Sequence, residues 1–190
     1  MSDSHVTLID RRAPRIVCNT RPGADWNTCG QAAIATVLAH FQLGPFSPGA
    51  LRGGSIDDGA AIDAVRERFP ADLPFGLGTT AARIAAALRV HGLAVERIRS
   101  GWRERGATRV LERLAAHVGA GHPVPVCLDL GRLDGTPLAY HWAVVTGITP
   151  EGVQLGNFGV GVVTLDRFLG AWQCRDLPPG HRHSAVIAWA

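Results

Sequence analysis

Three residues that lie far apart in the sequence, Cys29, His141 and Asn157, carry the groups that acyl transfer through a thioester requires. Cys29 offers a nucleophilic sulfur, His141 a general base and acid, and Asn157 a hydrogen bond that orients the imidazole ring. Each residue alone is a weak signal, because a single cysteine is more often a small apolar residue of the core. The chemistry therefore depends on a fold that brings the three together.

Cys29 stands where a loop turns into a helix. The preceding NTRPGADWN, residues 19–27, contains glycine and proline, whereas CGQAAIATVLAHF, residues 29–41, is rich in alanine and has apolar residues at helical spacing. Gly44 and Pro45 then end the helix. Because the amides and the dipole at a helix N-terminus favour a thiolate, this position is suited to an activated nucleophile.

His141 and Asn157 fall on two consecutive predicted strands. His141 lies in AYHWAVVTG, residues 139–147, where a buried polar ring needs a partner such as a thiolate. Asn157 ends the following strand, and a turn at residues 149–152 would bring it beside the histidine. The order of the three residues thus fits a helix followed by an antiparallel sheet.

The elements that must position these residues are helical in the first part of the chain and extended in the second. Beyond the helix at Cys29, the patterns predict helices over residues 57–69, 79–92, 108–121 and 164–172. Strands are predicted over residues 94–99, 124–130, 139–148, 152–157 and 184–190, with hairpin turns at 133–136 and 149–152. This order indicates an α+β fold with a flexible arm over residues 1–17, a helical lobe over about 18–122 and an antiparallel sheet lobe over about 123–190.

Composition restricts the function further. The chain of 190 residues is long enough for one domain with a sizeable core, and its net charge of +3 is too small for a dedicated nucleic-acid binder. All 19 basic residues are arginine, which excludes lysine nucleophiles and Schiff bases.

The sequence shows neither a secretory signal nor a membrane span, so we expect a cytoplasmic protein with no membrane partner. Its four cysteines are then expected as thiols, with a Cys18–Cys29 disulfide as the less favoured alternative.

The order of the three residues and the motifs around them resemble the papain-like cysteine peptidases, and most closely the C39-like group. WNTCGQAAIATVL resembles the nucleophile segment of that group, and HWAVVTGI resembles its histidine strand. GNFGVGVVTLDRFLGAW resembles the stretch that holds the third residue and passes into a helix, and SAVIAW resembles the final strand. The likeness covers about residues 27–43 and 124–190, whereas 44–122 match only as generic helices. It implies a single papain-like domain over residues 18–190 with a Cys29–His141–Asn157 triad.

Two positions depart from the pattern of the C39-like group. Its third residue is usually aspartate followed by proline, whereas this chain has Asn157 and Phe158, an asparagine that resembles papain proper. Its oxyanion glutamine usually lies six residues before the cysteine, where this chain has Gly23. A side-chain amide of Asn27 or Asn19, with the backbone amide of the cysteine, can replace that donor, and Asn27 is the favoured candidate.

The sequence therefore predicts an enzyme that cleaves a peptide or amide bond through a Cys29 thioester, with no metal or organic cofactor. Two alternatives stay open. An amine that takes the acyl group instead of water would make the protein an amide-forming acyltransferase. The second alternative is a non-catalytic member of the fold that only binds peptide, which the absence of the oxyanion glutamine favours.

A possible partner surface lies between Arg97 and Arg113. The segment from Glu96 to Arg113 holds six arginines and three glutamates, a balance that suits an acidic peptide or an acidic carrier protein. The simpler interpretation is a solvated helix face with interspersed ion pairs.

Overall fold

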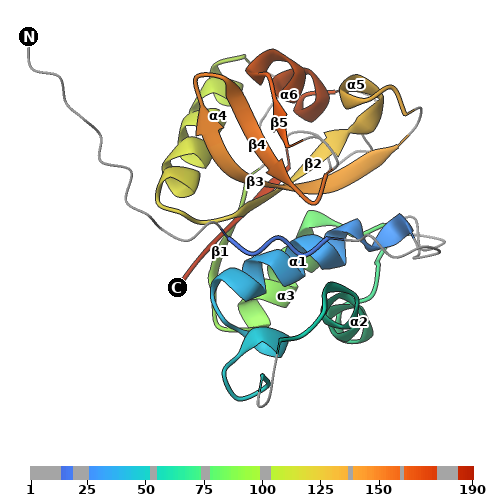
Figure 1. Cartoon of the computed structure of the whole chain (residues 1–190). Coiled ribbons are helices and arrows are strands. Elements are labelled where there is room, and N and C mark those ends of the chain that lie inside the picture. The colour runs from blue at the N-terminus through green and yellow to red at the C-terminus, as the bar shows by residue number, and fades with distance from the viewer. Residues whose placement is uncertain are drawn as a thin grey trace, which may run out of the picture.

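The structure is a computed structural model that describes residues 14–18, 26–51, 55–73, 78–98, 104–136, 139–158, 161–174 and 184–190. Within these residues, six α-helices and one six-stranded antiparallel sheet form an α+β fold, as the sequence predicts. Figure 1 shows helices α1, α2 and α3 on one side of the sheet, and α4, α5 and α6 on the other. Among the described helices, none has the length and apolar character needed to cross a membrane.

The first half of the described chain is mainly helical. Its elements are η1 (Trp26–Thr28), α1 (Cys29–His40), η2 (Gly44–Phe46), α2 (Asp58–Arg68), α3 (Ala81–Val90), β1 (Ala94–Ile98) and α4 (Glu104–Gly119). The side chain of Asp57 accepts a hydrogen bond from the first turn of α2, and that of Thr80 does the same for α3. Such caps explain why these two helices begin where they do.

The second half of the described chain is mainly extended. Its elements are β2 (Val124–Asp129), α5 (Leu130–Leu133), β3 (Tyr140–Thr149), β4 (Gly152–Gly156), β5 (Val162–Val163), α6 (Leu165–Trp172) and β6 (Ala185–Trp189). β2 and β3 pair as the predicted hairpin requires, but their connection is longer than the predicted turn at residues 133–136, because it begins with the short helix α5. The Asp129 carboxylate accepts a hydrogen bond of 2.8 Å from the Gly131 N–H, and this cap starts α5.

The strand order in the sheet is β1-β6-β2-β3-β4-β5. The last strand, β6, therefore lies between β1 from the helical half and β2 from the extended half. At the centre, β2 pairs with β3 so that Leu128 is opposite His141, and β3 pairs with β4 from Val144 opposite Gly156 to Thr149 opposite Gly152. β1 thus belongs to the sheet although it precedes the predicted sheet lobe.

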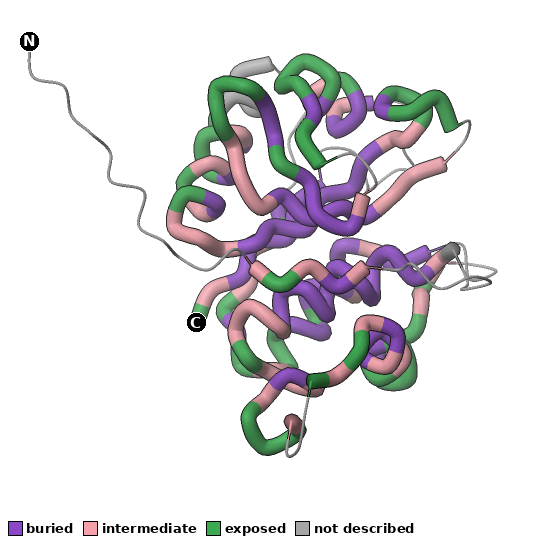
Figure 2. The backbone as a smooth tube through the Cα atoms, viewed as in Figure 1, coloured by how far each residue is buried: buried purple, intermediate pink, exposed green. Residues whose placement is uncertain are grey.

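The sheet has a separate hydrophobic core on each face. Along β3, Trp142 and Val144 pack with α1 and α3, whereas Ala143 and Val145 pack with residues of α4 and α6. This alternation follows from the two-residue period of a strand. Figure 2 shows that buried residues are concentrated in α1 and in the middle of the sheet.

Residues 14–18 lie across α1 and against the end of β4 (Figure 1). Val17 is fully buried, and its N–H donates a hydrogen bond of 3.1 Å to Thr36 Oγ1 in α1. Ile16 fills the space above Gly156, where an added Cβ would come within 2.5 Å of Ile16 Cδ1. Ile16 and Val17, the last two residues of the predicted flexible arm, are therefore packed through their apolar side chains. Residues 1–13 lie outside the described part.

The start of α1 depends on a glycine. A Cβ on Gly30 would come within 2.5 Å of the Cβ of Thr79, in the segment that leads into α3. Since Thr79 is almost fully buried, it has little room to move away. Gly30 therefore allows α1 and this segment to approach closely.

Replacing this glycine should destabilise the protein. We expect Gly30→Ala to lower the free energy of unfolding by about 1–3 kcal/mol, because it overpacks a closed interface. Gly170→Ala is the matched control: Gly170 also lies in a helix, α6, but an added Cβ there meets nothing within 4 Å. Better helix propensity should make that variant more stable by up to about 1 kcal/mol. Urea unfolding of both variants measures the difference, and equal effects would contradict the close approach at Gly30.

Candidate active site

Cys29 is the first residue of α1, and its side chain is buried, with 7% of its surface exposed. The imidazole of His141 on β3 and the backbone N–H groups of Gly30 and Trp142 lie close enough to the sulfur to lower its pKa. The structure thus brings together the predicted nucleophile and base, which are 112 positions apart in the sequence. The contact joins the helices on one side to the sheet.

The two side chains shift each other's proton affinity in opposite directions. Burial is the largest single influence on the pKa of Cys29, and it raises the pKa. The interaction with His141 and the two backbone N–H groups lower the pKa, and together they outweigh burial. The net pKa of the thiol therefore lies below its ordinary value. Burial likewise lowers the pKa of His141, yet the interaction with Cys29 and a hydrogen bond to Asn157 outweigh it and leave the pKa raised. Both shifts favour a thiolate–imidazolium pair over two neutral groups.

The imidazole of His141 is oriented by a backbone carbonyl. Its Nε2 lies 2.6 Å from the backbone oxygen of Asn157. Because a carbonyl oxygen only accepts hydrogen bonds, Nε2 must carry a proton and donate it. Nδ1 is then the nitrogen left to exchange a proton with Cys29.

Asn157 therefore lies where the sequence predicts, but a different group of the residue faces the histidine. Its side-chain Nδ2 donates a hydrogen bond of 3.3 Å to the backbone oxygen of Trp142 instead. The backbone of Asn157 has a φ of 60°, in the left-handed region that asparagine adopts more readily than most residues. This conformation turns the chain out of β4 and directs its carbonyl toward the imidazole.

The end of β4 also provides the position for the sulfur. β4 ends at Gly156, opposite Val144, while β3 extends further to Tyr140. Trp142 is opposite Cys127 on β2 but lies before the residues of β3 that pair with β4. On the side toward β4, its backbone N–H lies near the Cys29 sulfur, and its backbone oxygen accepts a hydrogen bond from the Asn157 side chain.

The predicted oxyanion donors are only partly within the described residues. Asn27 lies in η1, two positions before Cys29, and is half-buried. Gly23 and the alternative donor Asn19 lie outside the described residues. The assignment of Asn27 to the oxyanion site therefore stays a prediction.

Two further residues lie near the site in roles that the sequence analysis did not assign to them. The Asp134 carboxylate, which accepts a hydrogen bond of 2.9 Å from the Thr136 N–H, helps to raise the pKa of His141. The sulfur of Cys18 lies within hydrogen-bond range of the backbone N–H of Asn157. Only tertiary structure brings these side chains to the site, so no local motif could have found them.

The other cysteines differ from Cys29 in their surroundings. All four cysteines carry thiols. Burial, with the nearby charge of Asp58, raises the pKa of Cys18. Cys127 is fully buried, and its burial and the nearby Cys29 raise its pKa well above the ordinary value. Of Cys18, Cys29 and Cys127, only Cys29 has a lowered pKa.

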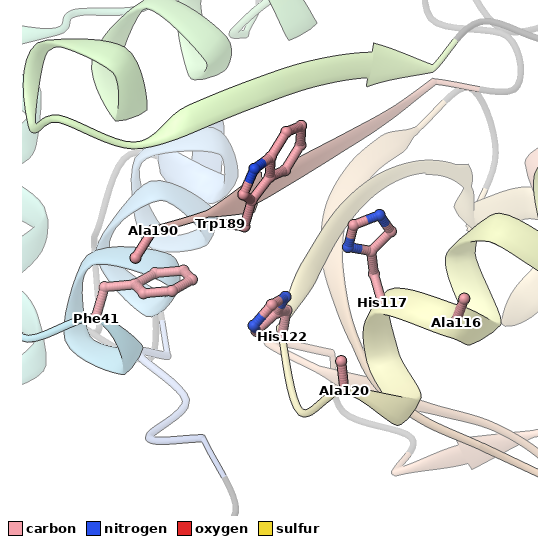
Figure 3. A pocket seen from close by; sticks show the side chains of 7 residues that line it. All are labelled: Phe41, Ala116, His117, Ala120, His122, Trp189 and Ala190. Atoms are coloured by element: carbon pink, nitrogen blue, oxygen red, sulfur yellow. The ribbon is translucent and has the colours of Figure 1, made fainter.

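A cavity of about 430 Å³ lies away from these residues (Figure 3). Its lining residues are Phe41, Ala116, His117, Ala120, His122, Trp189 and Ala190. It adjoins the C-terminal end of α1, whereas Cys29 stands at the other end, roughly 18 Å away for a helix of 12 residues. Within the described residues, no cluster of three or more His, Cys, Asp or Glu side chains is arranged to hold a metal ion.

Comparison with known proteins adds no family: no family model matches the chain, and no curated protein matches it either. The function is therefore inferred from the geometry around Cys29.

The lowered pKa of Cys29 predicts selective alkylation. We expect iodoacetamide to modify Cys29 well below the pH at which an ordinary thiol reacts, because the thiolate persists there beside imidazolium. Peptide mass spectrometry after timed labelling measures each cysteine separately. Faster labelling of the more exposed Cys18 throughout the acid range would contradict the ion pair. In His141→Ala, the pKa of Cys29 should rise and its labelling at acid pH should be lost.

Two substitutions at Asn157 distinguish its backbone from its side chain. Asn157→Gly keeps access to the left-handed conformation, whereas Asn157→Ala is strained there by about 1–2 kcal/mol. If the carbonyl orients His141, the glycine variant should retain more of the acid-range labelling of Cys29 than the alanine variant. Equal losses in both variants would instead assign the orienting role to the side chain.

Proposed function

We propose that the protein is a papain-like thiol hydrolase that cleaves a peptide or amide bond through an acyl-enzyme on Cys29. The observation that carries this proposal is the buried Cys29 at the start of α1, close enough to His141 for the two groups to shift each other's pKa, while Nε2 of His141 is held by the backbone oxygen of Asn157. An imidazole oriented in this way is the arrangement that activates a cysteine nucleophile. The central helix that begins at the cysteine and the antiparallel sheet that carries the histidine support a papain-like fold.

In the first half of the proposed reaction, the Cys29 thiolate attacks the carbonyl carbon of the scissile bond. A carbon–sulfur bond forms, and negative charge collects on the carbonyl oxygen, where the side chain of Asn27 is the proposed donor. Imidazolium Nδ1–H of His141 then protonates the departing nitrogen, and the carbon–nitrogen bond breaks. The amine leaves, and the acyl group stays on Cys29 as a thioester.

In the second half, water takes the place of the amine. Neutral His141 accepts a proton from water as the oxygen attacks the thioester carbon. The carbon–sulfur bond breaks, the acid is released, and the thiolate–imidazolium pair is restored. Asn157 O keeps Nε2–H bonded throughout, so only Nδ1 exchanges protons.

An amide-forming acyltransferase is the second candidate, since an amine can replace water in the last step. Its acyl donor would be bound to an acidic carrier protein at the arginines between Arg97 and Arg113. Arg97 and Arg109 are exposed, which favours such docking, whereas Arg113 is paired with Glu96. Because this ion pair neutralises part of the charge, hydrolysis is the first choice.

The test uses intact-protein mass spectrometry with a p-nitrophenyl acyl ester as the probe. We expect the wild-type protein to gain the mass of the acyl group on Cys29 and then lose it to water. Cys29→Ala should gain nothing, and His141→Ala should acylate at least about 1,000-fold more slowly. If the acyl group leaves Cys29 faster by transfer to an added amine than by reaction with water, the result favours the acyltransferase. If the well-folded wild-type protein is not acylated, both enzymatic proposals are wrong, and a peptide-binding module becomes the preferred interpretation.

A further inference from the structure

Trp142 contacts three separate parts of the candidate site. Its backbone N–H lies close enough to the Cys29 sulfur on α1 to lower the pKa of the thiol, and its backbone oxygen accepts a hydrogen bond from Asn157 Nδ2 at the end of β4. Its indole Nε1–H donates a hydrogen bond of 2.7 Å to the backbone oxygen of Thr79, just before α3. The side chain is 2% exposed, so these bonds form away from water.

The indole bond fixes the helices relative to the sheet near the sulfur. Thr79 packs directly against Gly30, the residue after Cys29, as the 2.5 Å approach of an added Cβ shows. The Thr79 hydroxyl also donates a hydrogen bond of 3.4 Å to the side chain of buried Gln31. A continuous set of contacts therefore leads from the indole of Trp142, through Thr79, to the first turn of α1.

His141 immediately precedes Trp142 on β3, so the same indole bond also fixes the histidine. His141 is part of β3, and Cys29 is the first residue of α1. The indole bond connects these two elements through Thr79. A shift of the sheet against α1 would lengthen the contact between Cys29 and His141. In a buried site the energy of an ion pair depends steeply on its separation.

We propose that Trp142 is a positioning residue that sets the separation of Cys29 and His141 through its indole N–H. This proposal rests on the proposed function, because the separation matters only if the pair performs acyl transfer. The indole N–H of Trp142 is bonded to the backbone oxygen of Thr79 and not to the sulfur or the imidazole. Its loss should therefore weaken the thiolate–imidazolium pair without removing either member.

The sharpest test compares two tryptophans. Trp142→Phe removes the indole N–H and keeps an aromatic ring. Trp172→Phe is the matched control, because the Trp172 side chain is also fully buried, and its Nε1–H donates a hydrogen bond of 3.1 Å to the backbone oxygen of Ser184. Trp172 belongs to the core on the opposite face of the sheet. Both variants lose a buried hydrogen bond from an indole N–H to a backbone oxygen, but only Trp142→Phe loses it at the candidate site.

Three measurements separate positioning from stability. We expect both variants to unfold at a lower temperature than the wild type. Only Trp142→Phe should label Cys29 with iodoacetamide more slowly at acid pH, by about ten-fold, and show a matching shift of the acid limb of the pH profile of kcat/KM for the p-nitrophenyl acyl ester. Trp172→Phe should keep the wild-type profile in both assays.

Trp142→Phe with a wild-type labelling profile would overturn the positioning role and leave the proposed function intact. Ordinary thiol labelling of wild-type Cys29 would instead refute the ion pair on which the proposed function depends. If Trp142→Phe does not fold, 3-benzothienylalanine placed at position 142 keeps the shape of the indole and lacks its N–H. That variant should reproduce the slower labelling, and a wild-type profile in it would overturn the proposal.

Discussion

The contact between the Cys29 thiol and the His141 imidazole is the interaction on which the site depends. Burial by itself opposes charge on both groups, since it raises the pKa of the thiol and lowers that of the imidazole. The charged pair is favoured only because the two groups lie close together and share hydrogen bonds. Since one group belongs to α1 and the other to β3, the fold must hold a helix and a sheet in a fixed relation.

Several close contacts provide that relation. Gly30 lets the start of α1 approach Thr79, and the indole of Trp142 connects Thr79 to β3. Residues 14–18 add a second connection, because they contact α1 through Val17 and the end of β4 through Ile16. The thiol and imidazole therefore lie where contacts from both faces of α1 restrict movement against the sheet.

The sequence predicts the elements well and the atoms of the site less well. Periodicity gives the longer helices and strands but misses the short helix α5 and the two-residue strand β5. The positions of Cys29 and His141 follow from a helix start and a strand. The sequence does not reveal that the carbonyl of Asn157 faces the imidazole, because a left-handed backbone is set by how β4 ends. The packing of Ile16 and Val17 also escaped prediction, since a segment this short has no periodicity and its partners are distant in sequence.

Asn157 stands where the C39-like pattern has aspartate, and the contact of its backbone carbonyl with His141 makes this difference less important. A carboxylate at position 157 would be needed only if a side chain oriented the imidazole, but Nε2 of His141 meets a group that every residue has. What position 157 requires is a residue that tolerates a φ of 60°, and asparagine is among the best suited. The asparagine is therefore no argument against activity. Gly23 is different, because glycine has no side chain to stabilise an oxyanion, so a donor such as Asn27 must replace the glutamine for catalysis.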